Sequence, residues 1–278
     1  MSKISFTVYI ILANNEENRM KTPSFLKKWY TSRKFQSISR LLFKVYFLLN
    51  EFNLGNLIRS RNVMANLEIK SGEKIFDAGC GVGLYSLRMA YKGAYVVGGD
   101  LSPLFKYSSL LGDAKLLKDI DFILMDLNYI PLKSETFDKI ICVDVLEHIR
   151  NDGNVVAELS RILKKNGELI IHVPNLKRYA KLKTQEKQKY MRLEKTTFGH
   201  VRNGYTLNQL STLFKKNNIQ VQDYTYTFGF WSQVAGKFSS VFRGNVIIFP
   251  LLFFLALIDR ASKINEYNGG ILVKGKRY

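Results

Sequence analysis

Residues 74–86 read Lys-Ile-Phe-Asp-Ala-Gly-Cys-Gly-Val-Gly-Leu-Tyr-Ser. A short apolar run ends in an acid, three glycines follow at alternate positions, and a helix-like run then begins. Glycine lets the backbone turn tightly and lets a ligand approach bare main chain. Asp77, directly ahead of the turn, would repel a phosphate and attract a positive charge. The segment therefore predicts a strand–turn–helix unit that binds a cationic cofactor.

A dinucleotide site is the main alternative for such a glycine turn. Gly79, Gly81 and Gly83 give the pattern GxGxG, whereas the dinucleotide fingerprint needs glycine or alanine one position later. Leu84 stands at that position. The local pattern therefore disfavours a dinucleotide.

The chain around this turn alternates strand and helix signals. Continuous apolar strands of this kind indicate a parallel sheet covered on both faces, which is an α/β, doubly wound architecture. We expect helices over 57–67, 83–91 and 154–164, and another that begins at Thr206 with that residue as its cap. The expected strands are 74–78, 94–99, 121–125, 139–143, 168–173, 220–228 and 270–275.

Polar residues at the carboxyl ends of the strands are candidate ligand contacts, because open α/β sheets bind ligands there. Asp100 is placed to accept from two ribose hydroxyls, and Asp126 from an adenine amino group. The candidate cofactor-binding residues are Asp77, Gly79, Cys80, Gly81, Gly83, Asp100, Leu101, Asp126, Leu127 and Asp144.

Several segments together resemble class I S-adenosylmethionine-dependent methyltransferases of the type 11 kind. The resemblance covers roughly residues 55–230 and implies a Rossmann-like, mostly parallel seven-stranded sheet with S-adenosylmethionine as cofactor. The segments that carry it are 76–83, 98–102, 125–127, 137–138, 144–148 and 163–169.

The resemblance also assigns roles to the strand-end residues. The three glycines of the turn would line the methionine part of the cofactor, and Asp77 would approach its amino group. Asp100 would hold the ribose, and Asp126 with Leu127 would hold the adenine.

The three histidines carry different expectations. His148 is a candidate general base near the acceptor, with a structural role as the alternative. His200 lies in a segment that resembles one beside the acceptor pocket of related enzymes, whereas His172 lies inside a strand and is expected to be structural. The two cysteines, Cys80 and Cys142, suggest neither a disulfide framework nor a zinc site, so no metal is expected.

Charge and hydropathy divide the chain further. The net charge of +19 implies attraction to an anionic partner. Residues 1–54 are expected to form a basic, apolar helical region, of which 1–20 are set aside because Met20 is an alternative start. Residues 55–278 would form the methyltransferase domain. Within that domain we expect a basic insertion at 175–203 and an apolar helical segment at 244–262.

The apolar segment favours an enzyme at a membrane surface. Its charge-free core, residues 246–258, is thirteen residues long, whereas a membrane span needs about twenty. Arg243, Arg260 and Lys263 flank that core as cationic anchors for an interfacial segment. Packing in the protein core is the alternative. The expected acceptor is a small molecule, lipid or lipid-linked saccharide at the cytoplasmic, inner face of the membrane.

Two other functions fit the sequence. An RNA methyltransferase would use the basic surface for phosphate contacts. Against it, residues 144–147 read Asp-Val-Leu-Glu in place of the Asn/Asp-Pro-Pro-Tyr/Phe motif of enzymes that methylate exocyclic base amines. A non-catalytic subunit that binds S-adenosylmethionine is the second alternative.

Overall fold

The structure is a computed structural model that describes residues 54–105, 116–180, 182–232, 254 and 265–278. The expected N-terminal helical region therefore lies outside the described residues, except for its last residue. Most of the apolar segment 244–262 lies outside them too. The proposed domain division stays a prediction.

A seven-stranded sheet with the order β3-β2-β1-β4-β5-β7-β6 forms the centre of the domain. β1 to β5 are parallel to one another, and β7 runs antiparallel to both β5 and β6. This confirms the predicted Rossmann-like, mostly parallel sheet. The strands are β1 (Lys74–Ala78), β2 (Tyr95–Asp100), β3 (Ile120–Leu124), β4 (Phe137–Val143), β5 (Leu163–Pro174), β6 (Ile219–Thr227) and β7 (Gly270–Arg277).

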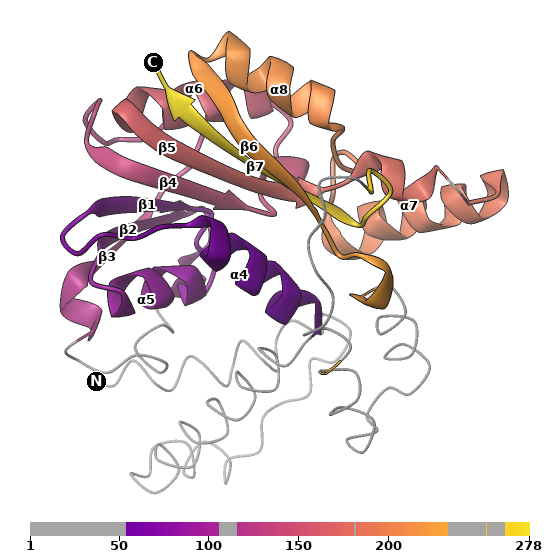
Figure 1. The fold of residues 1–278 in the computed structure, drawn as a ribbon, viewed down its shortest axis with the longest axis horizontal. Coiled ribbons are helices and arrows are strands. Elements are labelled where there is room, and N and C mark those ends of the chain that lie inside the picture. Colours follow the sequence, from indigo (N-terminus) through magenta and orange to yellow (C-terminus); the bar gives the residue numbers. More distant parts are fainter. Residues whose placement is uncertain (1–53, 106–115, 181, 233–253, 255–264) are drawn as a thin grey trace, which may run out of the picture.

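Helices cover both faces of the sheet (Figure 1). α4 (Leu54–Asn66) and α5 (Leu84–Tyr91) lie on one face, with α6 (Asp152–Ile162) and α8 (Leu207–Lys216) on the other. Each pair buries an apolar stripe, so the strands between them are apolar on both sides. Thr206 caps α8 in a capping box with Gln209, as expected for the cap.

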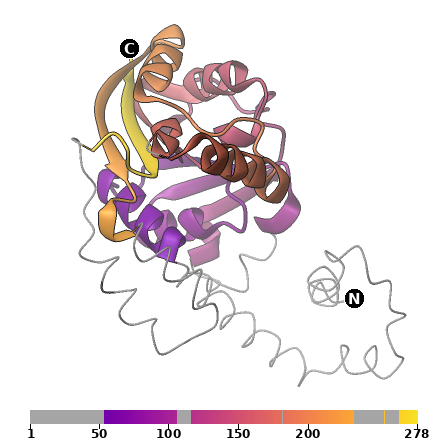
Figure 2. The same ribbon diagram turned by 90° about the vertical axis from the view of Figure 1, so that its right-hand side faces the viewer.

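The predicted end of the helix 154–164 was wrong. α6 ends at Ile162 rather than at residue 164, because Leu163 takes an extended conformation and pairs with Phe137 at the start of β5. The region 175–203, predicted as an insertion, contains the short helix η4 (Leu176–Tyr179) and the helix α7 (Thr184–Phe198). α7 projects from the side of the sheet where the carboxyl ends of the parallel strands lie. Figure 2 shows the molecule from that side.

Candidate functional site

The glycine turn lies at the topological switch point of the sheet, because β1 has β2 on one side and β4 on the other. Gly79 has a φ of +74°, and a Cβ there would lie 2.3 Å from Cγ2 of Val145. Gly81 has a φ of +54°, and no atom of the described residues lies within 4 Å of the equivalent position, so its main chain is bare in this part of the structure. The turn thus offers an open backbone surface at the crevice where ligands of such sheets bind.

The side chain of Asp100, the last residue of β2, is hydrogen-bonded to this glycine turn. Its Oδ2 accepts a hydrogen bond from the Gly81 N–H at 2.8 Å, and its Oδ1 accepts one from the Ser102 N–H at 2.7 Å. The carboxylate is half-buried, and the neighbouring Leu101 side chain is 74% exposed. Each carboxylate oxygen can accept a second hydrogen bond. Asp100 can therefore bind a hydroxylated ligand that lies against Gly81.

Asp77 is buried beneath the turn, and its Oδ2 accepts from the Ser86 hydroxyl at 2.6 Å. Burial raises the pKa of its carboxyl to about 7, although hydrogen bonds from Ser86 oppose the shift. Through this hydrogen bond Asp77 contacts the first turn of α5, where Ser86 lies. Its predicted contact with the cofactor amino group stays a prediction. Cys80 is buried beside it, and burial raises the pKa of that thiol.

Asp77 should make folding stability depend on pH. A carboxyl with a raised pKa keeps its proton in the folded state while the unfolded chain releases one, so stability falls as pH rises from about 4 to about 7. Between pH 5 and 7.5 the loss should be roughly 2–3 kcal/mol. Asp77→Asn should lack this part of the pH dependence in urea unfolding.

A matched control removes a carboxylate that is exposed. Asp119→Asn should leave the difference between pH 5 and pH 7.5 as in the unmodified protein. An Asp77→Asn protein with the same difference as the unmodified one would contradict the assignment.

The loop after β3 carries Asp126 and Leu127. Asp126 is exposed, and its Oδ1 accepts from the Asn128 N–H at 2.9 Å. The Leu127 side chain is buried in the core rather than open beside Asp126. Of the two residues expected to hold adenine, only Asp126 thus presents its side chain to solvent.

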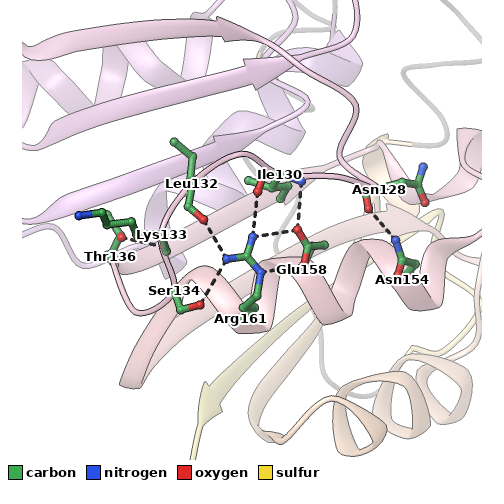
Figure 3. Close-up of polar contacts among 9 residues, drawn as sticks. All are labelled: Asn128, Ile130, Leu132, Lys133, Ser134, Thr136, Asn154, Glu158 and Arg161. Atoms are coloured by element: carbon green, nitrogen blue, oxygen red, sulfur yellow. Dashed lines mark hydrogen bonds and ion pairs between the residues drawn. The ribbon is translucent and has the colours of Figure 1, made fainter.

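Arg161 of α6 fixes this loop, as Figure 3 shows. Its guanidinium donates to the carbonyls of Ile130 and Leu132, each at 2.8 Å, and to the Glu158 carboxylate. Glu158 in turn accepts from the Ile130 N–H at 3.0 Å. The position of Asp126 therefore depends on a helix that is remote in sequence.

Arg161→Met should remove these bonds while keeping much of the side-chain volume. Because several hydrogen bonds to a charged group are lost, we expect destabilisation of about 2–3 kcal/mol in urea unfolding. Cofactor binding should weaken too, as the Asp126 loop loosens. Lys133→Met, which removes an exposed charge from the same loop, should be nearly neutral. Equal stability of the two variants would contradict the role of Arg161.

Asp144, at the end of β4, is already paired. Its carboxylate contacts Nε of Arg59 at 2.6 Å and Nδ1 of His172 at 2.5 Å. His172 also contacts the hydroxyl of Thr227 at 2.9 Å. Burial alone would raise the pKa of Asp144, but Arg59 and His172 lower it to about 2. His172 is thus buried between Asp144 and Thr227, which agrees with a structural role. That role and the predicted cofactor contact of Asp144 stay predictions.

His148 and His200, 52 positions apart in the sequence, meet in the structure. Their ring centroids lie 4.7 Å apart with an interplanar angle of 83°. Glu147, which was not predicted as a site residue, lies with them. Burial and the nearby Asp144 carboxylate raise the pKa of Glu147 to about 8. The only sequence signal for Glu147 was its place beside His148 in the segment 144–148.

Comparison with known proteins finds sequence similarity to methyltransferases over the part of the chain that forms this site. Residues 76–171 match a family model described as "Methyltransferase domain". A ubiquinone biosynthesis O-methyltransferase from Photobacterium profundum is 35% identical over 109 residues, which cover 37% of this chain and 45% of that protein. The chain spans about half the length of the curated relatives that it matches.

Solved structures show the same fold. An S-adenosylmethionine-dependent methyltransferase from Mesorhizobium loti superposes with a TM-score of 0.59 at 16% identity, covering 81% of this chain and 100% of that one. The [4+2]-cyclase SpnF superposes with a TM-score of 0.52 at 18% identity, covering 81% and 80%. The fold by itself thus does not fix the reaction.

The sheet order and the bare glycine turn at its switch point define a Rossmann-like domain built for a nucleotide-like ligand. Together with the segment that matches a methyltransferase-domain family, they agree with the class I S-adenosylmethionine-dependent methyltransferase domain predicted from the sequence.

Proposed function

We propose that this protein transfers the methyl group of S-adenosylmethionine to an oxygen atom of a small-molecule acceptor. The observation that carries the proposal is the Asp100 carboxylate beside the bare main chain of Gly81, within the matched domain. An oxygen acceptor is supported by the names of the curated relatives, which are O-methyltransferases.

The chemistry asks for alignment above all, because the sulfonium already activates the methyl group. A lone pair of the acceptor oxygen forms the new C–O bond as the C–S bond breaks. The electron pair of that C–S bond stays on sulfur, which gives neutral S-adenosylhomocysteine. The hydroxyl proton leaves to a base or to water, so the acceptor hydroxyl should lie near the polar groups that follow β4.

We further propose an acceptor with a lipid-like body, met at the cytoplasmic face of a membrane. The curated relatives are named for ubiquinone biosynthesis, and the sequence of residues 246–258 is apolar with cationic flanks. Phe230 and Trp231, which precede residues 246–258 in the chain, are 65% and 43% exposed. Among the described residues, no helix is long and apolar enough to cross a bilayer.

Labelled-methyl transfer into a whole-cell extract tests the reaction and its acceptor together. We expect label in the lipid or small-molecule fraction, and a thermal shift of the purified protein with S-adenosylhomocysteine. Label in RNA, with tight RNA retention that falls steeply with salt, would favour an RNA methyltransferase. A thermal shift without transfer to any fraction would favour a non-catalytic binding subunit. No shift at all would reject the proposed function.

Flotation with anionic liposomes tests the location. The protein should float with the vesicles, and deletion of 244–259 should release it. A protein that stays at the bottom with and without that segment would contradict the membrane proposal.

A further inference from the structure

A pocket of about 760 Å³ lies between the end of α7 and one face of α8. Residues 201–205, which join the two helices, form part of its wall, and α8 contributes side chains spaced one turn apart, at Asn208, Thr212 and Lys216. Gly81 and Asp100 do not line it, so the pocket is separate from the candidate cofactor site. Its volume suits a small molecule, since such sites measure about 300–1,000 Å³.

The loop that forms this wall is fixed to the sheet. A Cβ at Gly204, whose φ is +122°, would lie 2.3 Å from the carbonyl oxygen of Pro174, so the loop runs directly against the end of β5. The Tyr205 N–H donates to the same carbonyl at 2.9 Å. The Arg202 guanidinium donates to the Ile149 carbonyl at 2.7 Å. The pocket is therefore formed before any ligand arrives.

The lining of the pocket is cationic. Lys195, Arg202 and Lys216 line it, whereas Asp152 is the one carboxylate among the described lining residues. Asp152 is paired with Arg202 and accepts from the Tyr205 hydroxyl at 2.8 Å, so its charge is compensated. Lys195 and Lys216 are exposed, which leaves two ammonium groups beside the pocket. Lysine binds phosphate as a point charge, so the lining favours a phosphorylated ligand.

The side chain of Asn203 provides a second, independent observation. Its Oδ1 atom is buried and has no hydrogen-bond partner within the described residues, and the residue lines the pocket. Buried polar atoms in folded proteins are nearly always hydrogen-bonded, so a donor is expected here. A ligand hydroxyl would donate to this oxygen. Asn208 and Thr212 each offer a further donor and acceptor on an exposed side chain of the same pocket.

We propose that this pocket binds a free sugar phosphate. Its phosphate is attracted by Lys195 and Lys216, and one of its hydroxyls donates to Asn203. A nucleotide fits less well, because bases bind by stacking on exposed aromatic rings. Tyr205, the one aromatic side chain among the described residues that line the pocket, is only 4% exposed.

The pocket is joined to the segment that follows β4. The N–H groups of Val201 and Arg202 donate to the Glu147 carbonyl, at 2.9 and 3.3 Å, within the short helix η3 (Leu146–His148). A ligand that contacts residues 201–205 therefore contacts the loop that supports this helix. The inference does not depend on the proposed methyl transfer, because it concerns a second ligand at a separate site.

Isothermal titration calorimetry of the full-length protein tests the pocket. The probes are the 6-phosphates of glucose, galactose and mannose, with unphosphorylated glucose and inorganic phosphate as controls. We expect at least one sugar phosphate to bind about tenfold or more tightly than either control, because only it makes both the phosphate and the hydroxyl contacts. The affinity should be unchanged in saturating S-adenosylhomocysteine, since the two sites are separate.

Variants assign the binding to this pocket. Lys195→Gln combined with Lys216→Gln should weaken sugar phosphate binding about tenfold or more, because two charged partners are lost. Asn203→Ala should weaken it about fivefold to tenfold and leave the binding of inorganic phosphate unchanged. Lys92→Gln combined with Lys118→Gln removes the same charge from two exposed lysines, one after α5 and one ahead of β3, and should bind normally.

Thermal shift with S-adenosylhomocysteine shows whether each variant is folded. If Asn203→Ala does not fold, the exposed lysine pair still tests the pocket. The inference is wrong if none of the three sugar phosphates binds, or if the control pair weakens binding as much as Lys195→Gln with Lys216→Gln. Displacement of the sugar phosphate by S-adenosylhomocysteine would also overturn it. Sugar phosphate binding without a shift by S-adenosylhomocysteine would support the pocket while rejecting the proposed function.

Discussion

Asp100→Ala should raise the dissociation constant for S-adenosylhomocysteine at least about 100-fold. The carboxylate lies beside the bare main chain of Gly81, where the ribose of the cofactor is expected. Two hydrogen bonds from hydroxyls to a charged acceptor contribute about 1.5–3 kcal/mol each, and every 1.4 kcal/mol is tenfold in affinity. Isothermal titration calorimetry measures the change directly.

Part of this effect acts through the turn, because Asp100 also accepts from the N–H groups of Gly81 and Ser102. Asp100→Asn keeps the shape and one carbonyl acceptor, so it should fall between the alanine variant and the unmodified protein. Asp119→Asn, an exposed carboxylate ahead of β3, should bind normally. Unchanged affinity in Asp100→Ala, with the fold intact in urea unfolding, would remove the cofactor assignment.

Gly79→Ala should destabilise the fold by about 3 kcal/mol. The left-handed backbone at Gly79 costs an L-residue about 1–2 kcal/mol. The new Cβ would also lie 2.3 Å from Cγ2 of Val145, and overpacking typically costs about 1–3 kcal/mol. Urea unfolding gives the total.

Two companion variants separate these costs. Val145→Ala removes the clashing methyl groups, so the double variant should recover about 1 kcal/mol relative to Gly79→Ala alone. Gly81→Ala has the same left-handed strain, but no atom of the residues that the structure describes lies within 4 Å of the new Cβ, so the variant should lose only about 1 kcal/mol of stability. It should still impair cofactor binding, because its Cβ would cover the bare main chain. Equal destabilisation by the two alanines would contradict the role of Val145.

Local sequence predicted much of the fold. Strand β1 and the glycine turn could be predicted directly, because a short apolar run is typical of a buried strand and glycine readily adopts the positive φ values found at Gly79 and Gly81. The Thr206 cap was also predictable, because its capping-box partner Gln209 lies only three residues further along the chain. The end of α6 was not, because pairing of Leu163 with Phe137 decided it.

The amino-acid sequence by itself thus determined the class of domain and the glycine turn at its centre. Short-range backbone preferences and hydrophobic periodicity are local properties, so they can be read along the chain. Only the tertiary structure decided which side chains are available at the strand ends. It buried Leu127, paired Asp144 with Arg59 and His172, and brought His200 to Glu147. Those outcomes depend on contacts between residues far apart in the sequence, where burial and charge pairing act through space.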